Sequence, residues 1–237
     1  MARFLMIHGA GHGAWCWRDV LPLLADAGHD AAAIDLPGRA GDPRPKGEIT
    51  LADYADAILA ALDGPTILVG HSLAGMSITA AAEKDPGNIA RLVFLCAWMP
   101  LSGHSARDMR DWAPRNLLAG LTRMTDDGTA SYFDPASAAG ALYQDCPADA
   151  VAYAMDRLFP EPIEPQRTKV HHGKTFENLP KSYLICRDDR VIDPDAQRLM
   201  AARLPEADRY ELPCGHSPFF AAPGRLAAIL NQIAEPT

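Results

Sequence analysis

The chain has 237 residues, of which 48% are hydrophobic and 22% are charged, and its formal net charge is −8. This length suits one large domain or two small ones, and the ordinary composition excludes a disordered, collagen-like or coiled-coil protein. The acidic balance argues against a general nucleic-acid binder, and no apolar run approaches the roughly 18 residues that span a bilayer.

Short apolar runs alternate with helical stretches through the first hundred residues. Strands are predicted at 4–7, 31–34, 66–69 and 91–96, and helices at 15–27, 51–62 and 72–84. Gly28 is a stop signal for the first of these helices, and Thr50 is an N-cap for the second. Continuous apolar strands separated by helices are typical of a parallel sheet that is covered on both faces.

This alternation stops between about residues 100 and 175 and then resumes. Further strands are predicted at 183–186 and 209–212, and further helices at 194–204 and 223–233. We therefore predict an α/β fold with a mostly parallel sheet of about six strands. Residues 1–99 and 176–237 would form this core, and residues 100–175 would form an inserted helical cap above it.

The first glycine-rich motif follows the strand at 4–7. Gly9 to Ala14 fit G-x-G-x-x-A, and Asp35 stands at the end of the next strand, as in a dinucleotide-binding site. The 26 residues from Gly9 to Asp35 exceed the usual spacing of about 20. On its own, the motif leaves a dinucleotide site open.

A second motif, Gly70-His71-Ser72-Leu73-Ala74-Gly75, lies between a strand and a helix. This is the setting of a nucleophile elbow, in which a sharp turn lifts a serine hydroxyl clear of the sheet. The usual pattern is G-x-S-x-G, and here Ala74 takes the place of the last glycine. The alternative interpretation is a serine that merely caps a helix.

A nucleophilic serine needs a base and an acid that orients the base, and in this fold class they follow it in the order acid, then histidine. His216 follows the last strand, and Asp188 and Asp189 follow the strand at 183–186. These positions deliver the three groups to one edge of the sheet. Asp193, just before Pro194, is better explained as a helix cap, and local sequence does not choose between Asp188 and Asp189.

Together these residues resemble the α/β-hydrolase superfamily, and within it the plant methylesterase and hydroxynitrile-lyase group with its bacterial esterase relatives. The resemblance covers nearly the whole chain. It is carried by the segments around both glycine-rich motifs, by Asp35-Leu36-Pro37-Gly38, by Leu142 to Cys146, by Cys186 to Asp189 and by Gly215-His216.

The resemblance implies a catalytic triad of Ser72, Asp189 and His216. It also implies that the loop after His8 is an oxyanion loop and not a dinucleotide site. The backbone N–H of Ala10 in this loop and that of Leu73 would bind the developing negative charge. The implied activity is that of a carboxylesterase working through an acyl-enzyme.

Rival functions on the same fold are a hydroxynitrile-lyase-like reaction, C–C bond hydrolysis and non-enzymatic binding of a small molecule. Hydroxynitrile lyases of this group carry threonine and lysine where this chain has Gly9 and Ser217, which favours the esterase branch.

The cap is expected to roof the substrate pocket with apolar side chains and so to favour hydrophobic esters over charged ones. Candidate wall residues are Trp112, where relatives place a pocket tryptophan, and Tyr132, Phe133, Leu158 and Phe159. The implied triad mechanism requires no metal or organic cofactor. The adjacent pair His171-His172 could suggest a metal site, but adjacent histidines in a polar loop are more often solvated.

The expected partner is a small-molecule ester, with neither nucleic acid nor membrane, and a homodimer is left open. Five widely spaced cysteines without a C-x-x-C pair predict reduced thiols rather than a disulfide framework or a zinc site. The apolar part of the N-terminal stretch is too short for a signal peptide. We therefore expect a cytoplasmic protein.

Overall fold

The computed structural model describes residues 1–235, and a six-stranded sheet lies at its centre. The strands are β1 (Arg3–Ile7), β2 (Asp30–Ile34), β3 (Thr66–His71), β4 (Ile89–Leu95), β8 (Lys181–Cys186) and β9 (Arg209–Leu212). They run parallel in the order β2-β1-β3-β4-β8-β9, which confirms the predicted sheet. Every residue of β3 is buried, as expected for a central strand covered on both faces.

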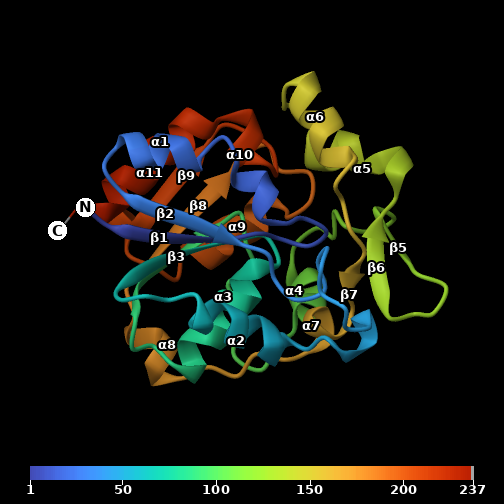
Figure 1. The fold of residues 1–237 in the computed structure, drawn as a ribbon, viewed down its shortest axis with the longest axis horizontal. Helices are drawn as coiled ribbons and strands as arrows, with labels where there is room; N and C mark the ends of the chain where they lie inside the picture. The colour runs from blue at the N-terminus through green and yellow to red at the C-terminus, as the bar shows by residue number, and fades with distance from the viewer. Residues whose placement is uncertain (236–237) are drawn as a thin grey trace.

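Helices cover both faces of this sheet (Figure 1). On one face lie α1 (Leu21–Asp26) and α11 (Pro223–Ala234), and on the other lie α2 (Leu51–Ala60), α3 (Ala74–Lys84) and α8 (Lys174–Asn178). In addition, α9 (Pro194–Ala201) packs against β8, and α10 (Pro218–Ala221) packs against α11. Because α8 contacts α3, the chain has rejoined the helix layer beside the sheet by Lys174–Asn178.

The local start signals of two helices act as predicted. Thr50 accepts a hydrogen bond from the Asp53 backbone N–H, and Asp53 accepts one in return from the Thr50 backbone N–H, so α2 begins with a capping box. Asp193 caps α9, and Pro194 occupies its first turn. The helix predicted over 15–27 is instead a 3-10 helix at Ala14–Trp17 followed by α1. Pro22 explains this difference, because proline is tolerated only in the first turn of a helix.

The insertion after β4 lies beyond the carboxyl ends of the parallel strands (Figure 1). Its elements are α4 (Ala106–Trp112), β5 (Thr122–Met124), β6 (Ala130–Phe133), α5 (Pro135–Leu142), α6 (Ala148–Met155), β7 (Glu161–Pro162) and α7 (Glu164–Arg167). The predicted helical cap is thus only partly helical, because β5, β6 and β7 form an antiparallel sheet. Gly128, with a φ of 68°, lies in the connection between β5 and β6.

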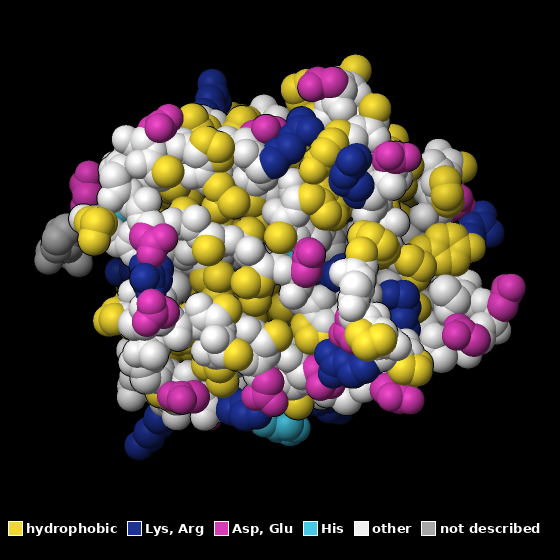
Figure 2. Space-filling view, viewed as in Figure 1, with side chains coloured by type: hydrophobic (Ala, Val, Ile, Leu, Met, Phe, Trp, Pro, Cys, Tyr) yellow, Lys and Arg dark blue, Asp and Glu magenta, His cyan; other side chains and the backbone are white. Residues whose placement is uncertain are grey.

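The distribution of charged side chains on the surface is consistent with the acidic net charge of the chain. On the face shown in Figure 2, acidic and basic side chains are interspersed, and no extended basic patch is visible there. Within residues 1–235, no helix has both the length and the apolar character that crossing a membrane requires. All five cysteine thiols are free.

Candidate active site

Ser72 sits on a strained turn between β3 and α3. Its φ of 56° lies in the left-handed region that non-glycine residues rarely adopt. A Cβ added at Gly75 would come within 2.1 Å of the Trp98 carbonyl oxygen, and one at Gly70 within 2.8 Å of Ile78 Cδ1. Of the two glycines of the elbow, Gly75 thus has the tighter approach, and neither position leaves room for a side chain.

The loop after β1 lies directly against this elbow. A Cβ at Gly9 would lie 2.7 Å from Ser72 Cβ, so the loop comes this close only because residue 9 is glycine. The exposed Asp35 carboxylate turns back onto this loop, because its Oδ1 accepts the Ala14 backbone N–H at 2.6 Å. These contacts argue against a dinucleotide site at the first motif.

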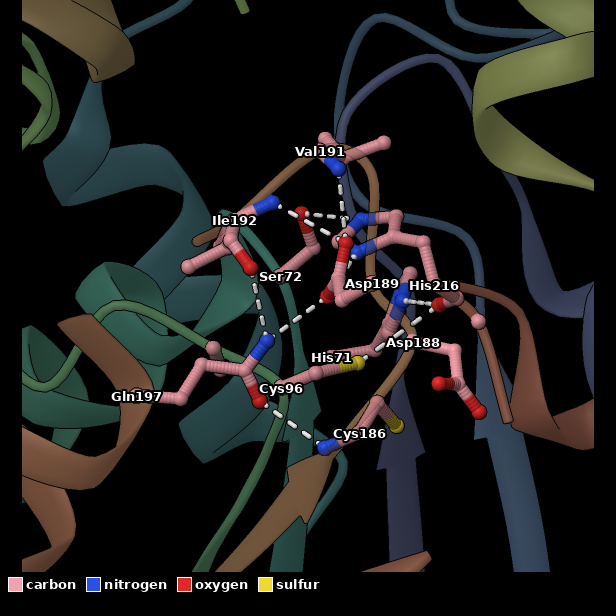
Figure 3. A network of polar contacts seen from close by, with 12 residues as sticks. His71, Ser72, Cys96, Cys186, Asp188, Asp189, Val191, Ile192, Gln197 and His216 are labelled. Atoms are coloured by element: carbon pink, nitrogen blue, oxygen red, sulfur yellow. Dashed lines mark hydrogen bonds and ion pairs between the residues drawn. The ribbon is translucent and has the colours of Figure 1, made fainter. Parts of the chain in front are cut away.

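Ser72, His216 and Asp189 form one chain of hydrogen bonds (Figure 3). His216 Nε2 lies 3.0 Å from Ser72 Oγ, and His216 Nδ1 lies 2.8 Å from Asp189 Oδ2. All three residues are buried. With Asp189 accepting the Nδ1 proton, Nε2 is left as the acceptor, so the imidazole can take a proton from the serine hydroxyl.

Asp189 is held by four hydrogen-bond donors. Its Oδ1 accepts the backbone N–H groups of Val191 and Ile192 at 2.7 and 3.0 Å. Its Oδ2 accepts from His216 and from Gln197 Nε2, the latter at 2.8 Å. Asp188 is exposed, and its side chain points away from His216 (Figure 3). The geometry thus separates two acids that the sequence alone could not.

A cavity opens over Ser72. Ala10 and Leu73 both line it. Within residues 1–235, the backbone N–H groups of Ala10 and Leu73 donate to no protein acceptor. Two free donors beside a buried serine hydroxyl are what binding of an oxyanion requires.

The insertion supplies the other side of the cavity, with a lining that differs in part from the predicted one. Tyr132 and Phe133 line the cavity, whereas Trp112, Leu158 and Phe159 are not among the lining residues that the structure describes. Helix α4 turns Ala106, Arg107 and Arg110 toward the cavity. At about 100° per residue, Trp112 faces roughly the opposite way from Arg110 and packs on the core instead. The roof is therefore not uniformly apolar.

A buried ionic network that the sequence did not reveal holds the loop after β1. Glu161 of β7 accepts the Gly11 backbone N–H at 2.9 Å and the Tyr54 hydroxyl at 2.7 Å, and it pairs with the Arg39 guanidinium. Burial on its own would lower the pKa of Arg39, but the Glu161 charge raises it. No local pattern signals this network, because its members lie on four separate segments.

Replacing Glu161 with glutamine is expected to lower the free energy of unfolding by about 3–5 kcal/mol, since Arg39 would keep a buried charge without a partner. Urea denaturation monitored by tryptophan fluorescence measures the free energy of unfolding of the variant and of the wild type. The double variant Glu161→Gln with Arg39→Met should recover part of the loss. A single variant within 1 kcal/mol of the wild type would show that the network does not stabilise the fold.

Three buried histidines surround the site in their neutral form. His8 Nε2 accepts the Leu36 backbone N–H at 3.0 Å, so His8 carries its proton on Nδ1. Burial lowers the pKa of His8 and His71 well below the usual value, and it lowers the pKa of His12 to about 4. Protonating any of them would place a charge in the core.

We therefore expect acid to destabilise the fold before the carboxylates titrate. The unfolded chain binds protons at these histidines below about pH 6.5 while the folded chain does not, so stability is complete above that pH and falls below it. Each histidine contributes up to about 1.4 kcal/mol per pH unit. Urea unfolding at pH 7.5, 6.5, 5.5 and 4.5 measures the slope. A stability that stays constant from pH 7.5 to 5 would contradict this expectation.

One group of possible metal ligands occurs within residues 1–235: His71, Cys96 and His216. His216 already contacts Ser72 and Asp189 through its two ring nitrogens. Burial raises the pKa of the Cys96 thiol to about 12, so the thiol keeps its proton. A metal ion would need a thiolate and a free imidazole nitrogen, and this group does not fit one.

These features define an α/β-hydrolase, and the comparisons with known proteins agree. Residues 4–229 match the family model described as "Alpha/beta hydrolase family", and the chain belongs to that family. It is 30% identical to salicylic acid-binding protein 2 of Nicotiana tabacum, over 98% of this chain and 96% of that protein. It is 29% identical to methylesterase 1 of Arabidopsis thaliana, over 98% and 95%. The predicted resemblance to plant methylesterases is thereby confirmed.

Comparison with solved structures also finds hydrolases whose fold is similar to that of this chain. A pyrethroid hydrolase from Sphingobium faniae superposes with a TM-score of 0.89 at 25% identity, covering 98% of this chain and 97% of that one. A methylesterase from Arabidopsis superposes with a TM-score of 0.84 at 26% identity, covering 98% of both chains.

Proposed function

We propose that this α/β-hydrolase is a serine carboxylesterase that cleaves small carboxylic esters through an acyl-enzyme. The observation that carries the proposal is the hydrogen-bonded chain from Ser72 through His216 to Asp189 at the floor of a cavity. The names of its relatives, which include methylesterases, support a carboxylic ester as the bond that is cleaved.

In the first half-reaction, His216 Nε2 takes the Ser72 proton as Oγ attacks the ester carbonyl carbon. The N–H groups of Ala10 and Leu73 stabilise the negative charge on the carbonyl oxygen, and loss of one such donor costs about 2.7–4 kcal/mol of barrier. His216 then gives the proton to the leaving alkoxide oxygen, and the alcohol departs.

In the second half-reaction, water attacks the acyl-enzyme, with His216 again taking and returning one proton. The products are the carboxylic acid and free Ser72. The apolar side chains of Leu73, Trp98 and Val191 line the cavity, so they would contact the uncharged part of the ester.

The proposal is tested with p-nitrophenyl acetate and butyrate on the purified protein, together with labelling by a fluorophosphonate probe. We expect turnover of both esters and a single covalent label on Ser72. Absence of both turnover and label would overturn the proposal. A label without turnover would favour a ligand-binding protein that retains a reactive serine.

A further inference from the structure

An unexplained group of arginines lies beside the candidate active site. The cavity over Ser72 adjoins a second hollow, and Arg107, Arg110, Thr122, Ser131 and Gln166 line both. The second hollow adds Arg167, from the end of α7. Three arginines from two helices therefore line two adjoining hollows, the first of which contains Ser72.

None of these arginines has an acidic partner. Within residues 1–235, no carboxylate oxygen lies within 4 Å of the guanidinium nitrogens of Arg107, Arg110 or Arg167, although the chain has 30 acidic residues against 22 basic ones. By contrast, Arg39, Arg115 and Arg123 all form ion pairs.

The one acid among the described lining residues of the two hollows already has partners. Glu161 lines the cavity, but its two oxygens accept from Arg39, Tyr54 and the Gly11 backbone N–H. Asp111 follows Arg110 in the sequence, and its carboxylate does not pair with that guanidinium. Among the residues that the structure describes, no carboxylate therefore forms an ion pair with any of the three arginines.

Arg110 is the deepest of the three and lacks a hydrogen-bond acceptor. It is half-buried, and its Nε is fully buried with no partner, whereas Arg107 and Arg167 are exposed. Buried donors normally find an acceptor, and leaving one unpaired is costly. Burial lowers the pKa of Arg110, Asp111 opposes this shift, and Arg107 adds to it. An anion beside Arg110 would supply both the missing acceptor and the missing charge.

The hydroxyl group of Ser131, which lines both hollows together with Arg110, is a further hydrogen-bond donor. Ser131 Oγ accepts from Gln166 Nε2 at 2.9 Å, so its own proton remains free to be donated. Guanidinium groups match the planar, two-oxygen geometry of a carboxylate, and hydroxyl donors add to such sites.

We propose that Arg107, Arg110 and Arg167 form a carboxylate subsite, so that the preferred substrates are esters carrying a second, free carboxylate remote from the scissile bond. Monoesters of short dicarboxylic acids are the simplest members of this class. This inference rests on the proposed esterase function. It differs from the expected apolar roof, because arginines form part of the lining.

The test compares monoethyl with diethyl esters of glutaric, adipic and suberic acid, with hydrolysis followed by acid release at constant pH. We expect kcat/KM to favour the monoethyl ester for at least one chain length. Replacing Arg110 with glutamine should lower the monoester-to-diester ratio by about 10- to 100-fold, the range for losing a hydrogen bond to a charged group. Arg110→Lys should restore part of the ratio, and raising the salt concentration should reduce it.

Arg123→Gln is the matched control. Arg123 is an exposed arginine of the same insertion, is paired with Asp134 and does not line either hollow, so the ratio should be unchanged. If Arg110→Gln does not fold, the exposed double variant Arg107→Gln with Arg167→Gln carries the same expectation. Hydrolysis of p-nitrophenyl acetate without any preference for monoesters would overturn the subsite and leave the esterase proposal standing. Absence of all ester hydrolysis would overturn the esterase proposal itself.

Discussion

Ser72→Ala is expected to lower kcat for p-nitrophenyl acetate by about 10⁴-fold or more, because no other hydroxyl can form the acyl-enzyme. The variant keeps the cavity and the two free N–H groups of Ala10 and Leu73, so substrate should still bind. Steady-state rates, with the concentrations of wild type and variant both measured by absorbance, give the loss. The label itself should disappear from the variant.

Ser77→Ala is the matched control for this experiment. Ser77 is a buried serine of α3, the helix that follows Ser72, and its hydroxyl has no hydrogen-bond partner within residues 1–235. Removing an unpaired buried hydroxyl should leave both activity and stability close to those of the wild type. If Ser72→Ala kept more than about a tenth of the activity, Ser72 would not be the nucleophile.

The sequence predicted the features that depend on order along the chain. Parallel strands bring their carboxyl ends to one edge, so residues placed just after three different strands had to meet there. The glycines of the elbow could be recognised because a sharp turn leaves no room for a side chain. The choice of Asp189 over Asp188 came from the family resemblance, and only the geometry supplies a physical reason for it.

The insertion was less predictable, because long-range packing decides its structure. The turn at Asp127-Gly128 is a recognised hairpin signal, and it lies between the short strands β5 and β6, so the antiparallel sheet could have been anticipated. By contrast, Trp112 could be assigned to a pocket or to the core only once the rotation of α4 was known. The pair of Glu161 with Arg39 joins residues that are 122 positions apart, and no local pattern reports it.

The second large effect expected is on the acid of the triad. Asp189→Asn should lower kcat by about 10⁴-fold, because it forces His216 into the wrong tautomer. The amide oxygen must take the place of Oδ1, which accepts the backbone N–H groups of Val191 and Ile192. The amide NH₂ then faces His216 Nδ1, which must become an acceptor, so the proton moves to Nε2 and the imidazole can no longer accept one from Ser72.

Gln197 cannot relieve this conflict by turning its amide. Its Oε1 accepts the Cys186 backbone N–H at 2.9 Å, so its Nε2 remains a donor directed at the new NH₂ group. Asp189→Asn should therefore also be less stable, and activity must be measured well below the temperature of unfolding. Asp188→Asn is the matched control, because the neighbouring carboxylate is exposed and points away from His216. We expect that control to keep at least half of the wild-type kcat. Comparable losses in the two variants would mean that the hydrogen bond from His216 to Asp189 does not set the tautomer.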